Sequence, residues 1–172
     1  RLLLDADFIF CCTDSHGSRA VLGQLAYQYL IPSIDMGVSI VSKQEVVSHI
    51  TGRVQMLAPG LGCLTCAGLL DADAVRRDLM TAYERQADPY FLGDPQPQPA
   101  VISFNMTMAS LAVTMFLGAV IHIPVKARYQ IYIGVTGNIR TVLETPDPVC
   151  IVCSKRGALA RGDEWPLPAR QV

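Results

Sequence analysis

Residues 6–15 have the sequence ADFIFCCTDS, an apolar run that ends abruptly in polar residues. Its apolar part, residues 6–12, is rich in residues that favour β-structure, and Thr13, Asp14 and Ser15 follow it directly. Such a pattern predicts a short strand that is buried on both faces of a parallel sheet.

The following segment completes a predicted βαβ unit. Apolar residues recur at three- and four-residue spacing in residues 16–30, which indicates a helix that Pro32 ends. An apolar strand is expected at residues 32–41, and strand, helix and strand together are typical of an α/β sheet. Residues 51–57 can form a further strand that pairs with residues 38–41. The predicted fold class is therefore α/β and Rossmann-like, with a mostly parallel sheet and an antiparallel extension.

A proline-rich segment divides the chain without dividing the fold. Asp71 can cap a helix that runs to about Arg85, and four prolines follow within residues 86–99. We expect residues 1–172 to belong to one domain. Residues 71–99 are expected to form an exposed crossover between two parts of it.

The last third of the chain predicts a hairpin and a tail. Residues 129–135 and 140–144 flank a Thr-Gly-Asn turn, which is typical of two antiparallel strands. The tail, residues 154–172, is polar and is expected to lie over the surface or to reach another subunit.

Residues 101–125 contain no Lys, Arg, Asp or Glu, and by length alone they could cross a membrane. Polar residues such as Asn105 and His122 interrupt the run, and no basic or aromatic anchor precedes it. We therefore expect a buried helix rather than a membrane span. Because 51% of the residues are hydrophobic, burial in a subunit interface is also expected.

The charge of the chain argues against nucleic acid as a partner. The formal net charge is −1, so no overall basic field would attract a phosphate backbone. Asp5 and Asp7 interrupt the apolar start, which differs from a secretory signal, and we expect a reducing cytoplasmic location. Arg1 in place of Met indicates that the sequence starts inside a longer protein.

Four of the six cysteines form two CxxC pairs, Cys63 with Cys66 and Cys150 with Cys153. A two-residue gap lets a tight turn direct both sulfurs to one metal ion, and two such turns supply the four ligands of a tetrahedral Zn²⁺ site. A closed shell of four thiolates leaves no position for substrate, so the predicted site is structural. The alternative is two unrelated pairs that are redox-active or reduced.

The remaining cysteines and Asp14 lie at the end of the first predicted strand. Cys11 and Cys12 are expected to pack in the core as small apolar side chains. Asp14 lies where ligands bind in open α/β sheets, beyond the carboxyl end of a strand, and could hold Mg²⁺ or a ribose hydroxyl. Alternatively, Asp14 or Ser15 caps the following helix.

Taken in order, several segments resemble the ThiF/MoeB/HesA family, relatives of the ubiquitin-activating enzymes. Residues 8–15 are similar to the family's CTDN strand end, and Arg19 stands five residues after the aspartate. Residues 31–37 and 52–55 resemble the strands that follow in the family. Residues 103–112 resemble the helix after its crossover loop, and the two CxxC pairs match its zinc site.

The resemblance implies ATP-dependent adenylation of the C-terminal carboxylate of a ubiquitin-like or sulfur-carrier protein. It makes Asp14 the magnesium and nucleotide aspartate, Arg19 a supporting residue, and the chain part of a homodimer. Ser15 differs from the family's asparagine, and the family's glycine-rich loop is absent from residues 1–172. The chain alone is therefore expected to be inactive, and the competing hypothesis is a non-catalytic, zinc-stabilised protein-binding module.

Overall fold

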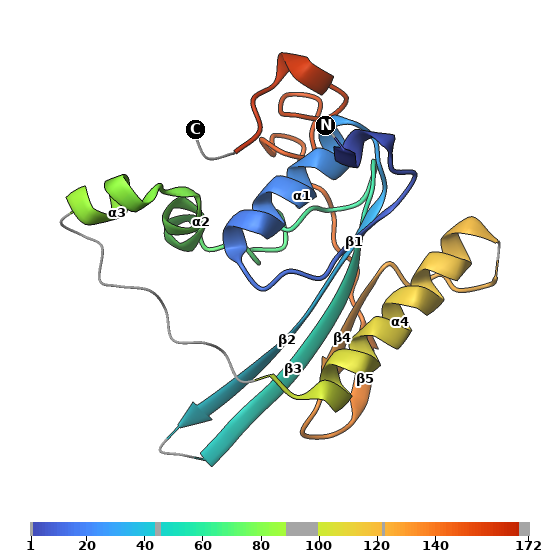
Figure 1. Ribbon diagram of the computed structural model, residues 1–172. Coiled ribbons are helices and arrows are strands. Elements are labelled where there is room, and N and C mark those ends of the chain that lie inside the picture. The colour runs from blue at the N-terminus through green and yellow to red at the C-terminus, as the bar shows by residue number, and fades with distance from the viewer. Residues whose placement is uncertain (1, 44–45, 89–99, 122, 169–172) are drawn as a thin grey trace.

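A computed structural model of the chain describes residues 2–43, 46–88, 100–121 and 123–168. One sheet lies between helices on its two faces (Figure 1). The elements in chain order are η1 (Leu2–Asp5), β1 (Ile9–Cys11), α1 (His16–Gln28), β2 (Ser33–Lys43), β3 (Val46–Leu57), α2 (Ala72–Leu79), α3 (Ala82–Ala87), α4 (Ile102–Val120), β4 (Tyr129–Ile133), β5 (Asn138–Thr141) and η2 (Gly162–Glu164).

The strands follow one another across the sheet in the order β1-β2-β3-β4-β5. Only β1 and β2 are parallel, with Ile9 opposite Ser33, and the other three pairings are antiparallel. A parallel pairing needs a crossover of a dozen or more residues, and α1 supplies the one that joins β1 to β2. The α/β class and the antiparallel pairing of β2 with β3 are confirmed. The prediction of a Rossmann-like, mostly parallel sheet is wrong.

Helix α1 and strand β1 form the predicted βα unit with two differences. The side chain of Ser15, not that of Asp14, caps α1 by accepting a hydrogen bond from the Ser18 backbone N–H at 3.0 Å. Strand β1 is only three residues long, and Phe10 is partly exposed on the face where it contacts Phe116 of α4. The expectation of a strand buried on both faces is therefore wrong.

The helix predicted after Asp71 is divided in two. Asp71 caps α2 as expected, by accepting a hydrogen bond from the Ala74 backbone N–H at 2.6 Å. Helix α2 ends at Leu79, and Thr81 begins α3 with a capping box that Glu84 completes. The proline-rich residues 89–99 lie outside the described residues.

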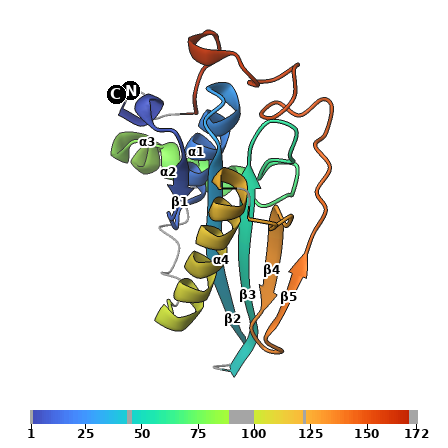
Figure 2. The same ribbon diagram turned by 90° about the vertical axis from the view of Figure 1, so that its right-hand side faces the viewer.

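Helix α4 packs along β2 and β3 on one face of the sheet (Figure 2). Its buried side chains are Met108, Ala112 and Met115, whose spacing places them on one stripe of the helix. Only 22% of its most apolar window is buried, so the expectation of a buried helix is wrong within this chain. The helix has no charged residue, and it contacts the sheet along one side. Its length and composition would permit a membrane span, as they would in many core helices.

The predicted hairpin is confirmed as β4 and β5, and the tail returns to α1. Tyr29, just after α1, donates a hydrogen bond to Asp163 of the tail at 2.6 Å, and the Ala160 backbone N–H donates to the Tyr27 carbonyl at 3.0 Å. The tail residues near η2 therefore lie beside α1, as both views show (Figures 1 and 2).

Candidate metal centre

The first cysteine turn, residues 63–66, follows β3. A short loop after Leu57 ends in this turn, and the Cys66 backbone N–H donates to the Cys63 Sγ at 3.5 Å. N–H groups directed at a sulfur stabilise its thiolate form, because they place positive partial charge beside it. The turn therefore has the local geometry that a metal-binding CxxC pair needs.

The second cysteine turn, residues 150–153, comes from the segment after β5. The Val152 backbone N–H donates to the Cys150 Sγ at 3.4 Å. A bond between the two segments joins the turns, since the Asp147 backbone N–H donates to the Cys66 Sγ at 3.4 Å. Each turn thus provides an N–H donor to one of its own sulfurs, and the segment just before the second turn provides one to a sulfur of the first.

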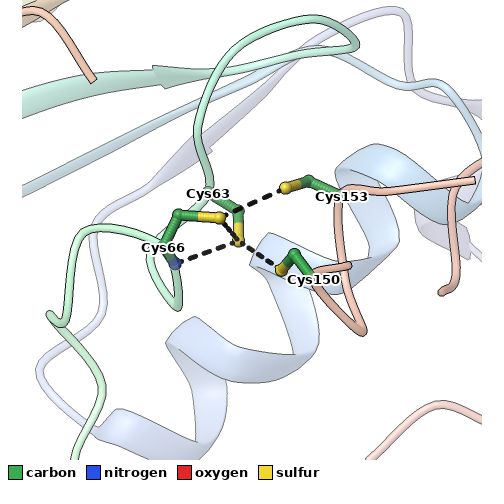
Figure 3. A group of neighbouring side chains, drawn as sticks. All are labelled: Cys63, Cys66, Cys150 and Cys153. Atoms are coloured by element: carbon green, nitrogen blue, oxygen red, sulfur yellow. Dashed lines mark hydrogen bonds between the residues drawn. The ribbon is translucent and has the colours of Figure 1, made fainter. Parts of the chain in front are cut away.

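All four sulfurs converge on one point (Figure 3). The four Sγ atoms lie within 4.8 Å of one another. Between the turns, the Sγ atoms of Cys63 and Cys150 are 3.5 Å apart and those of Cys66 and Cys153 are 3.4 Å apart. Four sulfurs at about 2.3 Å from a tetrahedral Zn²⁺ lie about 3.8 Å from one another. The arrangement therefore matches a zinc site, as the CxxC pairs predicted.

The cluster is mostly buried, and burial controls the protonation of its thiols. Without a metal, burial raises the pKa of Cys63 to about 12, and burial together with neighbouring thiols raises the pKa of Cys153 above its ordinary range. Although burial opposes it, the N–H groups directed at Cys66 lower the pKa of that thiol. A bound cation would reverse the effect of burial, because zinc coordinates thiolates.

The cysteine cluster forms part of a hydrophobic core. Tyr27 of α1, Leu57 of β3 and Leu64 of the first cysteine turn pack in one cluster with three of the cysteines. The Tyr27 hydroxyl donates to the Leu61 carbonyl at 3.1 Å, which ties α1 to the loop before the first cysteine turn. Metal binding would therefore stabilise the contact between α1, the end of β3 and the tail.

The chemistry of this donor set favours a structural role. Four cysteines complete a tetrahedral shell and leave no position for a water or a substrate, unlike catalytic zinc sites with three protein ligands. Soft thiolate ligands in this geometry select Zn²⁺ over Mg²⁺ or Ca²⁺. The four cysteines fit the expected ion, so the site can fix two distant segments but cannot itself act on a substrate.

Asp14 lies apart from the metal centre, at the edge of an open pocket. Asp14 is exposed, and its neighbours Thr13 and Ser15 line a pocket of about 680 Å³ at the start of α1. Arg85 of α3 and Asp78 of α2 line the same pocket, and Asp78 accepts a hydrogen bond from the Gly17 backbone N–H at 2.8 Å. The role predicted for Asp14 in nucleotide binding stays a prediction.

Arg19 points to the sheet rather than to this pocket. Its guanidinium forms an ion pair with Asp35 of β2 at 2.5 Å, and Arg53 of β3 pairs with the other oxygen of Asp35 at 2.5 Å. Asp35 is fully buried. The sequence pattern did not predict this triad, because Asp35 stands inside an apolar strand and only the pleat of the sheet shows that it faces α1.

The sequence pattern also did not predict the buried side-chain amides that bind the tail. Gln28 donates hydrogen bonds of 2.6 Å from Nε2 to the carbonyls of Gly162 and Trp165, and Gln24 donates to the Pro166 carbonyl at 2.8 Å. Both glutamines are buried on α1. The expectation that Cys11 and Cys12 both pack in the core is half right, since Cys11 is buried and Cys12 is exposed.

Comparison with known proteins corrects the family assignment. No protein-family model matches this chain, and no curated protein matches it. The chain is similar to a solved structure described as "Structure of the heterocyclase TruD", with a TM-score of 0.47 and 17% sequence identity over 88% of this chain. The likeness is distant, and the chain spans 23% of that protein, which is an enzyme by its description. The assignment to the ThiF/MoeB/HesA family is therefore wrong.

Proposed function

We propose that this chain is a zinc-stabilised protein-binding module in which Cys63, Cys66, Cys150 and Cys153 hold one structural Zn²⁺. The observation that carries the proposal is the convergence of four sulfurs from two distant turns to within 4.8 Å. The ion would fasten the tail against α1 and the end of β3, and would leave the sheet and α4 free for a partner. The site needs reduced thiols, which suits a reducing compartment such as the cytoplasm.

The distances favour one metal site over two redox-active pairs. A redox CxxC pair works with its own two sulfurs, and its partner turn has no reason to lie nearby. Here the Cys66 and Cys153 sulfurs, from different turns, are closer at 3.4 Å than the Cys63 and Cys66 sulfurs of one turn at 3.7 Å. A shared ion accounts for such cross-turn proximity.

Metal analysis of the reduced, purified protein tests this proposal. We expect about one zinc per chain, measured by elemental mass spectrometry after dialysis against metal-free buffer. Cys153→Ser should lose most of this zinc, whereas Cys12→Ser should retain it, because Cys12 is exposed and lies outside the cluster. The proposal would be contradicted if zinc-free protein folded with the same stability as zinc-loaded protein.

A second copy of the chain is the partner that we propose for α4. Large apolar side chains such as Ile102, Met106 and Val113 are exposed on this helix, which has no charged residue. An uncharged apolar stripe is complementary to itself, and a two-fold dimer buries it on both copies. Sedimentation equilibrium should show a dimer that Met106→Lys converts to monomer, while Tyr83→Lys, on the exposed surface of α3, leaves it intact.

A second candidate function is the adenylation of a carrier protein's C-terminal carboxylate by a longer protein that contains this chain. One observation favours it: the open pocket of about 680 Å³ lies at the start of α1, beyond the carboxyl end of β1, with Arg85 in its wall. Ligands of α/β sheets bind at this position, and an arginine can offset phosphate charge. In this candidate, Asp14 would hold Mg²⁺ and ATP, and Arg19 would keep α1 in place on β2 through its pair with Asp35.

Exchange of radioactive pyrophosphate into ATP separates the two candidates. The assay would use the full-length protein with ubiquitin-like and sulfur-carrier proteins. Carrier-dependent exchange that Asp14→Ala abolishes would support adenylation. Absence of exchange with every carrier, in protein that holds its zinc, would leave the binding module as the function.

A further inference from the structure

One face of the sheet is left open where α1 does not cover it. The pleat of the strands determines which side chains lie on this face. Residues directly opposite one another in neighbouring strands share a face. Across the sheet, Gly37 of β2 lies opposite Arg53 of β3, which lies opposite Ile131 of β4, which lies opposite Arg140 of β5. Because Arg53 pairs with Asp35, which also pairs with Arg19 of α1, this row faces the α1 side. We call this side of β2–β5, with Arg19 above it, the arginine face.

Basic groups dominate the arginine face. Arg19, Arg53 and Arg140 contribute three positive charges. Asp35 is the one acidic residue in the described parts of β2, β3, β4 and β5. The opposite face is apolar and is covered by α4, where Val54 and Met108 pack together. The sheet therefore has a covered apolar face and an open face with a surplus of positive charge.

The ion triad fixes two of these arginines in place. Arg19 and Arg53 have side chains that are 12% and 18% exposed, and both pair with the one carboxylate of Asp35. Two guanidinium groups that share one carboxylate leave a net positive charge in a partly buried setting, where an added anion is attracted strongly. The Arg19 Nη2 lies 2.8 Å from the position that a Cβ on Gly37 would take, so the guanidinium rests directly on the sheet.

The rest of the arginine face offers apolar and polar contacts to an extended chain. Ile131 and Ile133 are partly exposed in β4, with Arg53 and Arg140 on either side of Ile131. Ser39 and Thr51 are exposed on the same face, in the neighbouring row. An apolar strip between arginines suits a peptide in which an apolar side chain stands among acidic ones.

Nucleic acid suits this face less well. Single strands bind sheets by stacking bases on exposed aromatic rings. Among the described strand residues of the arginine face, the aromatic rings are that of Tyr129, which is buried, and the exposed imidazole of His49, which is a single small ring. The formal charge of the whole chain, −1, also provides no long-range attraction for a polyphosphate.

We propose that the arginine face binds an acidic, extended peptide segment of a partner protein, with an apolar residue of that segment against Ile131. Charge complementarity carries the proposal, since three arginines outnumber two carboxylates, that of the internally paired Asp35 and that of Glu144 near Tyr129. It rests on the proposed role as a binding module and names the chemistry of the partner. Carboxylates of the peptide would contact Arg140 and the unshared N–H groups of Arg53.

Fluorescence anisotropy with a labelled peptide tests this directly. The probe is a glutamate-rich peptide with a central leucine, and the control peptide has glutamine in place of every glutamate. We expect the zinc-loaded protein to bind the acidic probe at least about tenfold more tightly than the control peptide, with affinity that falls as salt increases. Arg140→Glu should weaken binding of the acidic probe about tenfold, and Ser39→Glu should weaken it as well.

The matched control is Lys126→Glu, which reverses an exposed charge in the loop between α4 and β4. This variant should bind as the unchanged protein does. Equal loss in Arg140→Glu and Lys126→Glu would overturn the proposal, and so would tighter binding of an oligothymidylate than of the acidic peptide. Zinc content is measured on the same samples. Full zinc occupancy without peptide binding would reject this inference and leave the zinc site of the proposed function intact.

Discussion

The Sγ atoms of Cys66 and Cys153 lie 3.4 Å apart although 87 positions separate the two residues in the sequence. Each comes from a turn that approaches from a different side of the cluster, as Figure 3 shows. A single ion at this point would join the end of the chain to its middle. The stability of the fold should therefore depend on the metal and on both turns.

Loss of one ligand should lower thermal stability substantially. We expect Cys150→Ser to reduce Tm by at least about 10 °C, because structural zinc sites contribute many kcal/mol and one kcal/mol is worth roughly 2–4 °C in a domain of this size. Differential scanning calorimetry in reducing, zinc-containing buffer measures the change. Cys12→Ser is the control. An equal Tm for the two variants would show that zinc ligation does not contribute to thermal stability.

Zinc affinity should fall steeply as pH falls. Burial raises the pKa of Cys63 to about 12 and raises the pKa of Cys153, so the metal-free protein holds protons on both sulfurs at neutral pH. Zinc binds thiolates, and it must displace about two protons from these residues, so affinity should drop about a hundredfold per pH unit. Titration calorimetry in buffers with different ionisation enthalpies counts the released protons. Binding without proton release would show that the thiols are already ionised.

Asp35 should be essential to the packing of α1 on the sheet. Asp35→Asn keeps the shape but removes the charge that Arg19 and Arg53 share, and breaking a buried ion pair costs about 3–5 kcal/mol. We expect a fall of about 3 kcal/mol in the free energy of unfolding, measured by urea denaturation. Asp7→Asn, at an exposed position, should change it by less than about 0.5 kcal/mol. A similarly small change in the free energy of unfolding for Asp35→Asn would contradict the prediction. It would mean that Arg19 and Arg53 do not depend on the charge of Asp35.

The buried amide of Gln28 should hold the tail. Gln28→Leu leaves the carbonyls of Gly162 and Trp165 without this donor, which should cost about 2 kcal/mol of unfolding free energy. The tail should also become sensitive to limited proteolysis near η2. The same substitution at the exposed Gln86 of α3 serves as the control. Unchanged proteolysis of Gln28→Leu would assign the anchoring of the tail to the zinc turns alone.

Local patterns predicted much of the fold, because they depend on neighbours along the chain. The spacing of apolar residues predicted α1, a Thr-Gly-Asn turn predicted the β4–β5 hairpin, and paired cysteines predicted the four-cysteine cluster. Each signal lies within a few residues, where turn chemistry and periodicity operate.

Long-range features could not be predicted in the same way. The strand that contains Asp35 has the composition of a buried strand, and its partner arginines come from α1 and β3. The absence of charged residues from α4 indicated burial, but the helix meets the sheet along one side, around Met108 and Phe116, and its other side is exposed. The family assignment failed for a related reason: short matches in order carried it, while the sheet that they were expected to form proved mostly antiparallel.

A metal ion at the four-cysteine cluster would also determine how the molecule responds to mechanical load. Force applied between the two ends of the chain would pass from residue 66 to residue 150 through metal–sulfur bonds. Helices α2, α3 and α4 and the hairpin of β4 and β5 all lie between these residues in the sequence and would be shielded from tension until the ligation breaks. Stretched single molecules should therefore release this hidden length in one late step, and a chelator should abolish the delay.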